Sequence, residues 1–221
     1  MRFLLTVMTL MGISILFGSF DETVLKIENG LKEKKTLSIQ KNEIALLEKE
    51  AKTDLEKSIV KMYQGRIFFE KKDYDEAIDL FNDGIDLYEN YVENHFWRGK
   101  AYLELLKDAS FMSKGYYGSK TFDSFEKAVE IDPNHIDARL NLATCYKKAP
   151  AIGGGSIPKA KKHYLAAIKI NDKIAFAHFM LGEIYEKEDE NYKLAKESYE
   201  KALKLEPENI KFKEAVARVS K

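Results

Sequence analysis

The sequence predicts an all-α protein, a right-handed superhelical solenoid of about four stacked helix pairs, with a lead helix before them and a capping helix after them. Three observations predict this fold. Alanine, lysine, glutamate and leucine are abundant, whereas proline occurs only four times in 221 residues, which favours helix. A pattern of small and aromatic residues recurs about every 34 residues. Each repeat also ends where a helix is expected to stop. A single helix pair cannot bury its apolar face alone, so the pairs are expected to stack.

The composition excludes several function classes. Basic and acidic residues both number 36, which argues against a nucleic-acid-binding protein, because such proteins usually carry a basic excess. The single cysteine, Cys145, excludes an internal disulfide and a cysteine zinc site. The spacing of His95, His135, His163 and His178 matches no metal-binding motif,. The sequence therefore predicts no metal and no cofactor.

Residues 1–20, MRFLLTVMTLMGISILFGSF, have the order of a secretory signal peptide. Arg2 precedes an apolar run over 3–17, and the small residues Gly18 and Ser19 follow,. An apolar helix of this kind inserts into the bilayer with its positive end on the cytoplasmic side. We therefore expect an exported protein, either periplasmic or anchored on the outer side of the membrane.

Whether this segment is removed is left open by the sequence. Cleavage after Ser19 would leave the bulky Phe17 where a small residue is preferred,. Residues 3–20 are the alternative route of membrane attachment, since about 20 apolar residues are needed to span a bilayer. A cytosolic chain with an unusual start is the third possibility.

Residues 21–57 are expected to form a helical lead segment. The part from 40 to 57, QKNEIALLEKEAKTDLEK, predicts one charged helix that runs into the first repeat or covers its exposed face. The part from 21 to 39 predicts a weaker helical stretch, interpreted as a tether.

Four segments then align, at 58–91, 92–135, 136–174 and 175–209. The first helix of each segment, helix A, carries a small residue followed three positions later by an aromatic one: Gly65/Phe68, Gly99/Tyr102, Ala143/Tyr146 and Gly182/Tyr185. The second, helix B, carries small, aromatic and small residues in order: Ala77/Phe81/Gly84, Thr121/Phe125/Ala128, Ala160/Tyr164/Ala167 and Ala195/Tyr199/Ala202. Small residues let helix backbones approach closely, and a ring three or four positions away fills the gap beside them.

This signature resembles the tetratricopeptide repeat (TPR) family over about 150 residues. The resemblance implies a scaffold that holds another molecule, with one face of helix A lining a concave groove. By family position the groove would be lined by a set of aromatic, cationic and amide side chains: Tyr63, Arg66, Phe96, Trp97, Lys100, Asn141, Lys148 and Phe179. Aromatic residues mixed with cations suit an extended peptide, because rings supply contact area and cations hold carboxylates.

Segments two and three are longer than the family repeat, and the extra residues fall within 107–120 and 147–156. They predict enlarged turns between helices A and B on one edge of the stack, where binding elements are frequent. Pro150 is expected to end helix A of the third repeat, and Ser156 to cap the helix that follows. The glycines between them predict a turn rather than an anion site, since the phosphate-loop pattern is absent. Such turns loosely resemble those of bacterial exported TPR proteins, some associated with solute transport.

Residues 210–221, IKFKEAVARVSK, predict a capping helix whose inward side carries Ile210, Phe212, Ala215, Val216 and Val219,.

Three function classes remain after these steps. The first is an exported, non-enzymatic scaffold or adaptor that binds a protein or peptide in its groove. The alternative is a periplasmic ligand-binding or transport-accessory protein. An enzyme is the third class, but neither a nucleophile nor an acid–base pair can be assigned, and Cys145 is interpreted as a small packing residue.

Overall fold

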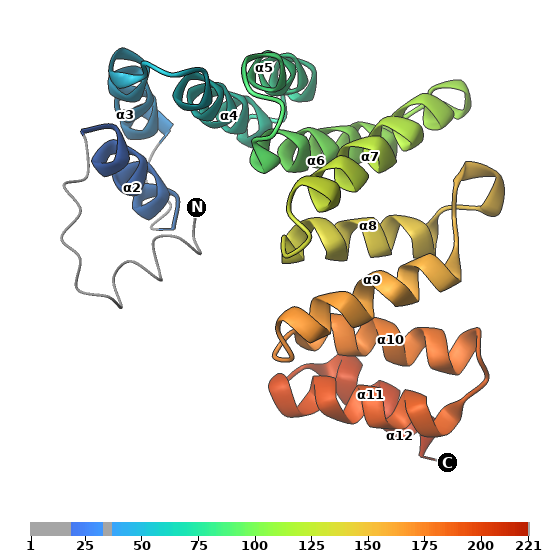
Figure 1. The fold of residues 1–221 in the computed structure, drawn as a ribbon. Coiled ribbons are helices and arrows are strands. Elements are labelled where there is room, and N and C mark those ends of the chain that lie inside the picture. The colour runs from blue at the N-terminus through green and yellow to red at the C-terminus, as the bar shows by residue number, and fades with distance from the viewer. Residues whose placement is uncertain (1–18, 33–36, 221) are drawn as a thin grey trace.

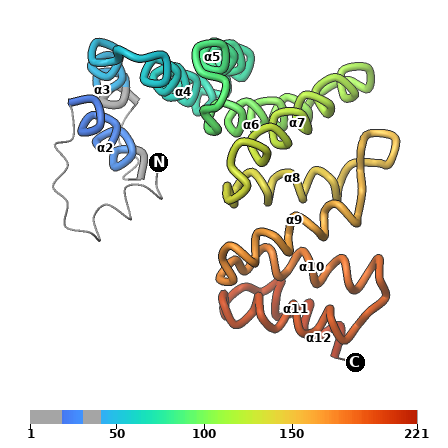
Figure 2. Tube along the Cα trace, viewed as in Figure 1, coloured from blue at the N-terminus to red at the C-terminus, as the bar shows by residue number. Residues whose placement is uncertain are grey.

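The computed structural model describes residues 19–32 and 37–220, so the predicted signal or anchor lies, up to residue 18, outside the described residues. Figures 1 and 2 show helices that follow one another along a curved stack. The helices are α2 (Ser19–Lys32), α3 (Leu37–Glu50), α4 (Asp54–Glu70), α5 (Tyr74–Leu87), α6 (Val92–Asp108), α7 (Phe111–Ile131), α8 (Ile136–Lys148), α9 (Ile157–Ile170), α10 (Ala175–Lys187), α11 (Tyr192–Leu205) and α12 (Ile210–Val219), with a short 3₁₀ turn, η1 (Ala151–Gly153). Over these ranges, every helix is too short or too polar to cross a membrane.

The all-α solenoid is confirmed, because α4 and α5, α6 and α7, α8 and α9, and α10 and α11 form four packed helix pairs. Helix A begins at the predicted residue in the last three repeats. In the first repeat it begins earlier, at Asp54. Each pair then packs on the next along the chain.

The close approach of the helices at the small residues is also confirmed. A Cβ on Gly65 would lie 2.5 Å from the ring of Phe81, and the same holds for Gly182 against Tyr199. At Gly99 the ring of Phe125 would be 2.8 Å away. The ring that fills each gap therefore comes from helix B of the same pair, and not from the aromatic residue three positions along helix A.

The turns between helix B and the next helix A are held by side chains at the fourth position of helix A. A ring nitrogen of His95 bonds the carbonyl oxygen of Glu89 at 2.8 Å, and His178 bonds that of Asp172 at 2.9 Å. In the turn between α7 and α8, Arg139 donates to the corresponding carbonyl, that of Pro133, at 2.6 Å. Two of the four histidines are thus structural residues of these turns.

The lead segment differs from the prediction, because residues 40–57 do not form one helix. Helix α3 ends at Glu50, and α4 starts at a capping box in which Thr53 and Glu56 exchange side-chain and backbone hydrogen bonds. The T-x-x-E spacing is a sequence signal for a helix start. Helices α2 and α3 instead form an additional pair, with Phe20 buried in the first core cluster.

The predicted enlarged turn at 107–120 was wrong, because these residues are almost entirely helical. Helix α6 continues to Asp108, and Ser110 caps α7 by accepting a hydrogen bond from the backbone of Ser113. Helix α7 has 21 residues, whereas the other three B helices have 14 each. The insertion therefore lengthens helix B by two turns, which project beyond the stack (Figure 1).

The predicted turn at 147–156 is confirmed. Helix α8 ends at Lys148, two residues before Pro150, and Ser156 caps α9 with its hydroxyl oxygen. Gly154 has a φ of 90°, which favours glycine,. A Cβ on Gly155 would collide with the carbonyl oxygen of Ala149.

The capping helix is present as α12, with one correction to its inward side. Phe212 and Ala215 are buried, and Val216 and Val219 pack against the core cluster of α10 and α11. Ile210 is 69% exposed, because it stands at the first position of the helix, outside the contact that Phe212 and Ala215 make.

Candidate partner-binding site

Five of the predicted groove residues come together on α4 and α6. The indole of Trp97 contacts two cations: the guanidinium carbon of Arg66 is 4.4 Å from the ring centroid, and the ammonium of Lys100 is 3.9 Å away. Phe69 packs edge-on against Trp97 with 5.4 Å between ring centroids. This set, Arg66, Phe69, Trp97 and Lys100, is called the Trp97 cluster below.

Two of the five predicted residues act mainly in packing. Phe96 is 7% exposed and packs against the rings of Phe125 and His135. Tyr63 is 3% exposed, and its hydroxyl donates a hydrogen bond to Glu28 of α2 at 2.8 Å. They support the Trp97 cluster from beneath, but they offer little surface to a partner.

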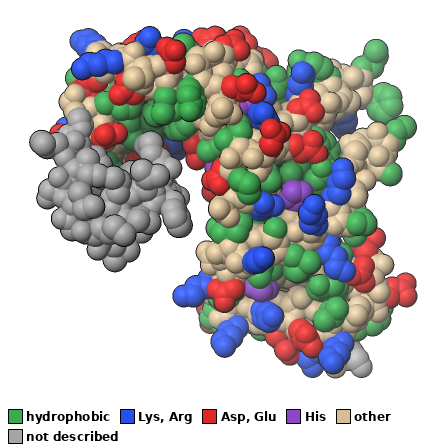
Figure 3. Space-filling view, in the orientation of Figure 1, with side chains coloured by type: hydrophobic (Ala, Val, Ile, Leu, Met, Phe, Trp, Pro, Cys, Tyr) green, Lys and Arg blue, Asp and Glu red, His purple; other side chains and the backbone are tan. Residues whose placement is uncertain are grey.

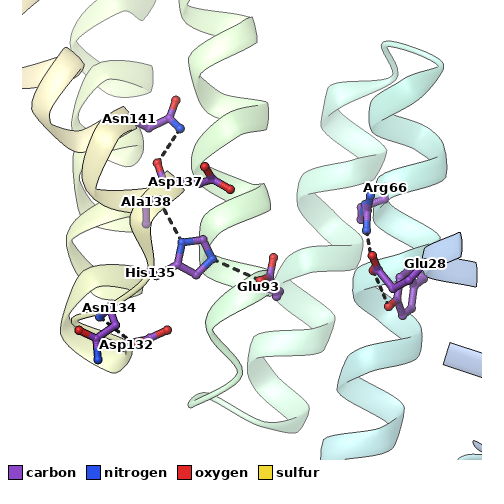
Figure 4. Close-up of polar contacts among 10 residues, drawn as sticks. Glu28, Arg66, Glu93, Asp132, Asn134, His135, Asp137, Ala138 and Asn141 are labelled. Carbon is purple, nitrogen blue, oxygen red and sulfur yellow. Dashed lines mark hydrogen bonds and ion pairs between the residues drawn. The ribbon is translucent and has the colours of Figure 1, made fainter. Parts of the chain in front are cut away.

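The two cations of the cluster are in different electrostatic situations. Arg66 forms an ion pair with Glu28 at 3.3 Å, as Figure 4 shows. Burial and the nearby charge of Arg66 lower the pKa of Lys100, and Lys100 has no ion-pair partner among the residues that the structure describes. Lys100 is therefore a partly desolvated cation, which an incoming carboxylate would stabilise.

A carboxylate is placed beside the cluster on the side of α8. Glu93 accepts a hydrogen bond from Nε2 of His135 at 3.2 Å (Figure 4). Burial opposes its ionisation, but this bond and the charges of His135 and Arg66 lower the pKa of Glu93. Nδ1 of His135 accepts from the backbone N–H of Ala138 at 3.0 Å, so the imidazole fixes both the start of α8 and the position of Glu93.

The other three predicted residues do not join the cluster. Asn141 donates to the carbonyl of Asp137 on its own helix at 2.8 Å (Figure 4). Lys148 is exposed at the end of α8. Phe179 stacks on Phe212 of α12 with 4.8 Å between centroids, so it belongs to the core beneath the cap.

Sequence reasoning missed Glu28 and Glu93. Glu28 could not be found, because the predicted tether gave no indication that α2 folds against α4. Glu93 falls on the first turn of helix A, and its approach to His135 of the next repeat depends on how the pairs stack. A cleft of about 300 Å³ lies elsewhere, between Tyr74, Leu105 and Tyr117, and contains none of the predicted groove residues.

Three family models match separate parts of the chain. A TPR repeat model matches residues 65–105, and two further tetratricopeptide repeat models match 124–153 and 177–209. The first match runs from α4 through α5 into α6, the second from the end of α7 through α8 to η1, and the third over α10 and α11. The chain belongs to the tetratricopeptide repeat family. The TPR pairs account for α4 to α11, and α12 closes the last of them.

Solved structures of other TPR proteins share this fold. The crystal structure of MamA matches with a TM-score of 0.61 and 22% identity, covering 74% of this chain and 81% of that one. TTC0263, a thermophilic TPR protein of Thermus thermophilus, matches at 0.65 and 16% identity, covering 91% and 99%. The human IFIT1 dimer with PPP-AAAA matches at 0.65 and 21% identity, covering 89% of this chain and 44% of that one. At these identities the similarity establishes a TPR scaffold fold.

Proposed function

We propose that this TPR protein is a non-enzymatic scaffold, exported from the cytoplasm, that binds an extended segment of another protein at the Trp97 cluster. The observation that carries the proposal is the contact of Trp97 with both Arg66 and Lys100, which lie on adjacent helices A. An aromatic face flanked by two cations can pack an apolar side chain and hold a carboxylate at once.

The charges of the cluster define the chemistry of the partner. Lys100 lacks a carboxylate among the described residues, whereas Arg66 already has Glu28. Glu93 lies on the far side, where it would repel a second acidic group,. The ligand we propose is therefore a peptide with one carboxylate beside an apolar or aromatic residue, bound in an extended form. The balanced net charge of the chain also favours a protein over a nucleic acid,.

Affinity capture with the full chain tests the groove. Wild-type protein and the Trp97→Ala/Lys100→Ala variant would be compared for the proteins that they recover from envelope extract. We expect at least one protein to be lost or reduced at least tenfold, since buried aromatic and cationic residues dominate binding energy at interfaces. A recovered protein would be confirmed by quenching or shifting the emission of Trp97, the only tryptophan in the sequence.

The matched control is another aromatic–lysine pair outside the cluster, Tyr192→Ala/Lys193→Ala at the start of α11, where both side chains are exposed. It should recover the same proteins as wild type. Identical recovery by the wild type and the Trp97→Ala/Lys100→Ala variant would refute the groove assignment. A small molecule that co-purifies, with no protein, would instead support the transport-accessory alternative.

Export is the second part of the proposal, and the order of residues 1–20 supports it,. Cell fractionation of the full chain should place it in the periplasm or in the membrane facing outward. Mass measurement of the purified chain would then distinguish a cleaved signal from a retained anchor. Recovery of the intact chain in the cytosol would refute this part while leaving the binding site untouched.

A further inference from the structure

A second surface lies at the edge of the stack where helices A and B meet. The N-terminal end of α7 and the turn around η1 project from the same edge (Figure 1). Phe111, Met112 and Ile152 stand there with exposed fractions of 93%, 91% and 99%. Figure 3 shows hydrophobic side chains standing out at the free end of α7. An isolated exposed apolar residue is ordinary, but a group of almost fully exposed large ones indicates an interaction surface.

The same two segments carry most of the local positive charge. Residues 107–120 and 147–162 together contain eight lysines and one acidic residue, Asp108, in a chain whose net charge is zero. Three of these lysines are paired with carboxylates on α6 and at α10 and its following turn: Lys107, Lys147 and Lys161. The other five form no ion pair with any acidic side chain in the described ranges: Lys114, Lys120, Lys148, Lys159 and Lys162.

One side of the projecting part of α7 faces open space, because a Cβ on Gly115 or Gly118 would meet nothing within 4 Å. Tyr116 and Tyr117 pack against Tyr102 and fix the direction in which the helix projects. The insertion thus builds a helical arm that carries two apolar side chains, Phe111 and Met112, at its tip.

We propose that this edge, defined by Phe111, Met112, Ile152, Lys114 and Lys148, docks onto the surface of an anionic lipid bilayer. The apolar side chains enter the headgroup region, and the lysines beside them attract the lipid phosphates. Lys114 lies one turn from Phe111, and Lys148 precedes the η1 turn, so each apolar tip has its own cation. The turn of the fourth repeat is acidic, with Glu188, Asp189 and Glu190, and marks the limit of the docking edge.

This orientation leaves the groove accessible. The Trp97 cluster lies on the helix A face of α4 and α6, whereas the docking edge lies at the far ends of α6 and α7 and at the α8–α9 turn. A bilayer on the edge would contact the ends of the helices rather than their inner face. The inference does not depend on the proposed partner at the Trp97 cluster.

A single tryptophan placed at the tip reports on lipid contact directly. The full chain with Trp97→Phe and Phe111→Trp would be mixed with vesicles of equal parts phosphatidylglycerol and phosphatidylcholine, and with phosphatidylcholine alone. We expect a blue shift and quenching by acyl-chain-brominated lipid with the anionic vesicles only. This readout is independent of residues 1–20, which every variant retains. Unchanged emission would overturn the proposal even if the protein binds vesicles.

Vesicle co-sedimentation then measures the contributions of the residues. Serine at Phe111, Met112 and Ile152 together should weaken binding to the anionic vesicles about tenfold or more. Each of Lys114→Gln and Lys148→Gln should weaken it about fivefold, and high salt should do the same. The control Lys204→Gln, at an exposed position on the opposite edge, should have little effect.

Two further results would count against lipid docking. A concentration-dependent blue shift of the Phe111→Trp reporter without vesicles would indicate that a second copy of the chain covers the tip. Equal emission shifts with anionic and neutral vesicles would remove the role of the lysines. Because the side chains replaced in the co-sedimentation variants are all exposed, these variants should keep the far-ultraviolet circular dichroism of the wild type.

Discussion

Single glycines set the spacing of the helix pairs. Replacing Gly65 by alanine would place a methyl group 2.5 Å from the ring of Phe81, which is itself fully buried. We expect Gly65→Ala to lower the free energy of unfolding by about 2 kcal/mol, because overpacking a rigid core outweighs the better helix propensity of alanine. Urea unfolding followed by circular dichroism measures this change.

The matched substitution is Gly115→Ala, in the projecting part of α7. A Cβ there meets nothing within 4 Å, so only helix propensity changes, and stability should rise by up to about 1 kcal/mol. If both substitutions shifted the urea midpoint in the same direction, the close approach at Gly65 would not determine the spacing of α4 and α5.

His163 makes the stability of the fold depend on pH. The ring lies against Tyr146 with 5.7 Å between centroids, and burial, with Arg139 and Lys162 nearby, lowers the pKa of His163 to about 4. In the unfolded chain the pKa of histidine is about 6.5. Between these values the unfolded state binds a proton that the folded state does not, so stability falls as pH drops from about 6.5 to 4.

The variant His163→Gln tests this dependence. Between neutral pH and about pH 4, the thermal stability of this variant should fall less than that of the wild type. Differential scanning calorimetry at a series of pH values would show the difference. If stability fell equally with pH in the two proteins, groups other than His163 would cause the acid sensitivity.

At the scale of elements, α12 stabilises the end of the stack through a few contacts. Phe212 stacks on Phe179, and Arg218 donates two hydrogen bonds to Glu186, at 2.6 and 2.8 Å. We expect Phe212→Ala to lower the unfolding free energy by about 3 kcal/mol, as for other large-to-small changes in cores. Ile210→Ala is the control, since Ile210 is 69% exposed and should cost little,. Thermal unfolding of both variants provides the comparison.

The elements themselves were predicted with uneven success for physical reasons. The four pairs could be found because small and aromatic residues must recur wherever backbones meet, and the turn at Pro150 because proline and glycine restrict the backbone. The insertion at 107–120 was predicted to be an enlarged turn because its extra residues fall between helices A and B of the family repeat. The insertion is helical because Ser110 caps the start of α7 and the extra residues extend this helix beyond the stack.

At the scale of the whole molecule, α2 controls the charge at the first end of the groove. Glu28 neutralises Arg66 at 3.3 Å and contacts Tyr63. We expect Glu28→Gln to raise the quenching of Trp97 by iodide roughly twofold at low salt, because the two cations would then attract the anion together. Fluorescence titration at constant ionic strength measures this effect.

Two comparisons make the result specific. Glu22→Gln changes the same charge at an exposed position of α2, and should leave quenching nearly unchanged. The neutral quencher acrylamide should not distinguish Glu28→Gln from wild type. A parallel rise with acrylamide would mean that Glu28 holds α2 over the indole rather than setting the local charge.

The candidate site was only partly predictable because it depends on how elements stack. Arg66, Trp97 and Lys100 were found from their positions on helix A, which the repeat fixes. The ion pair of Arg66 was not predicted, since Glu28 approaches from a helix pair that carries no repeat signature. Phe179 has the position on helix A that Phe96 has in the second repeat, and the capping helix α12 covers it because it lies in the last repeat.

The packing of each helix mainly against its immediate neighbours has a consequence for how the chain is made. Every helix pair can close as soon as its own residues are available, because no partner from a distant part of the sequence is required. A chain delivered through a narrow channel, start first, would therefore fold in the order in which it emerges, and α12 would complete the last pair when the final turn leaves the channel.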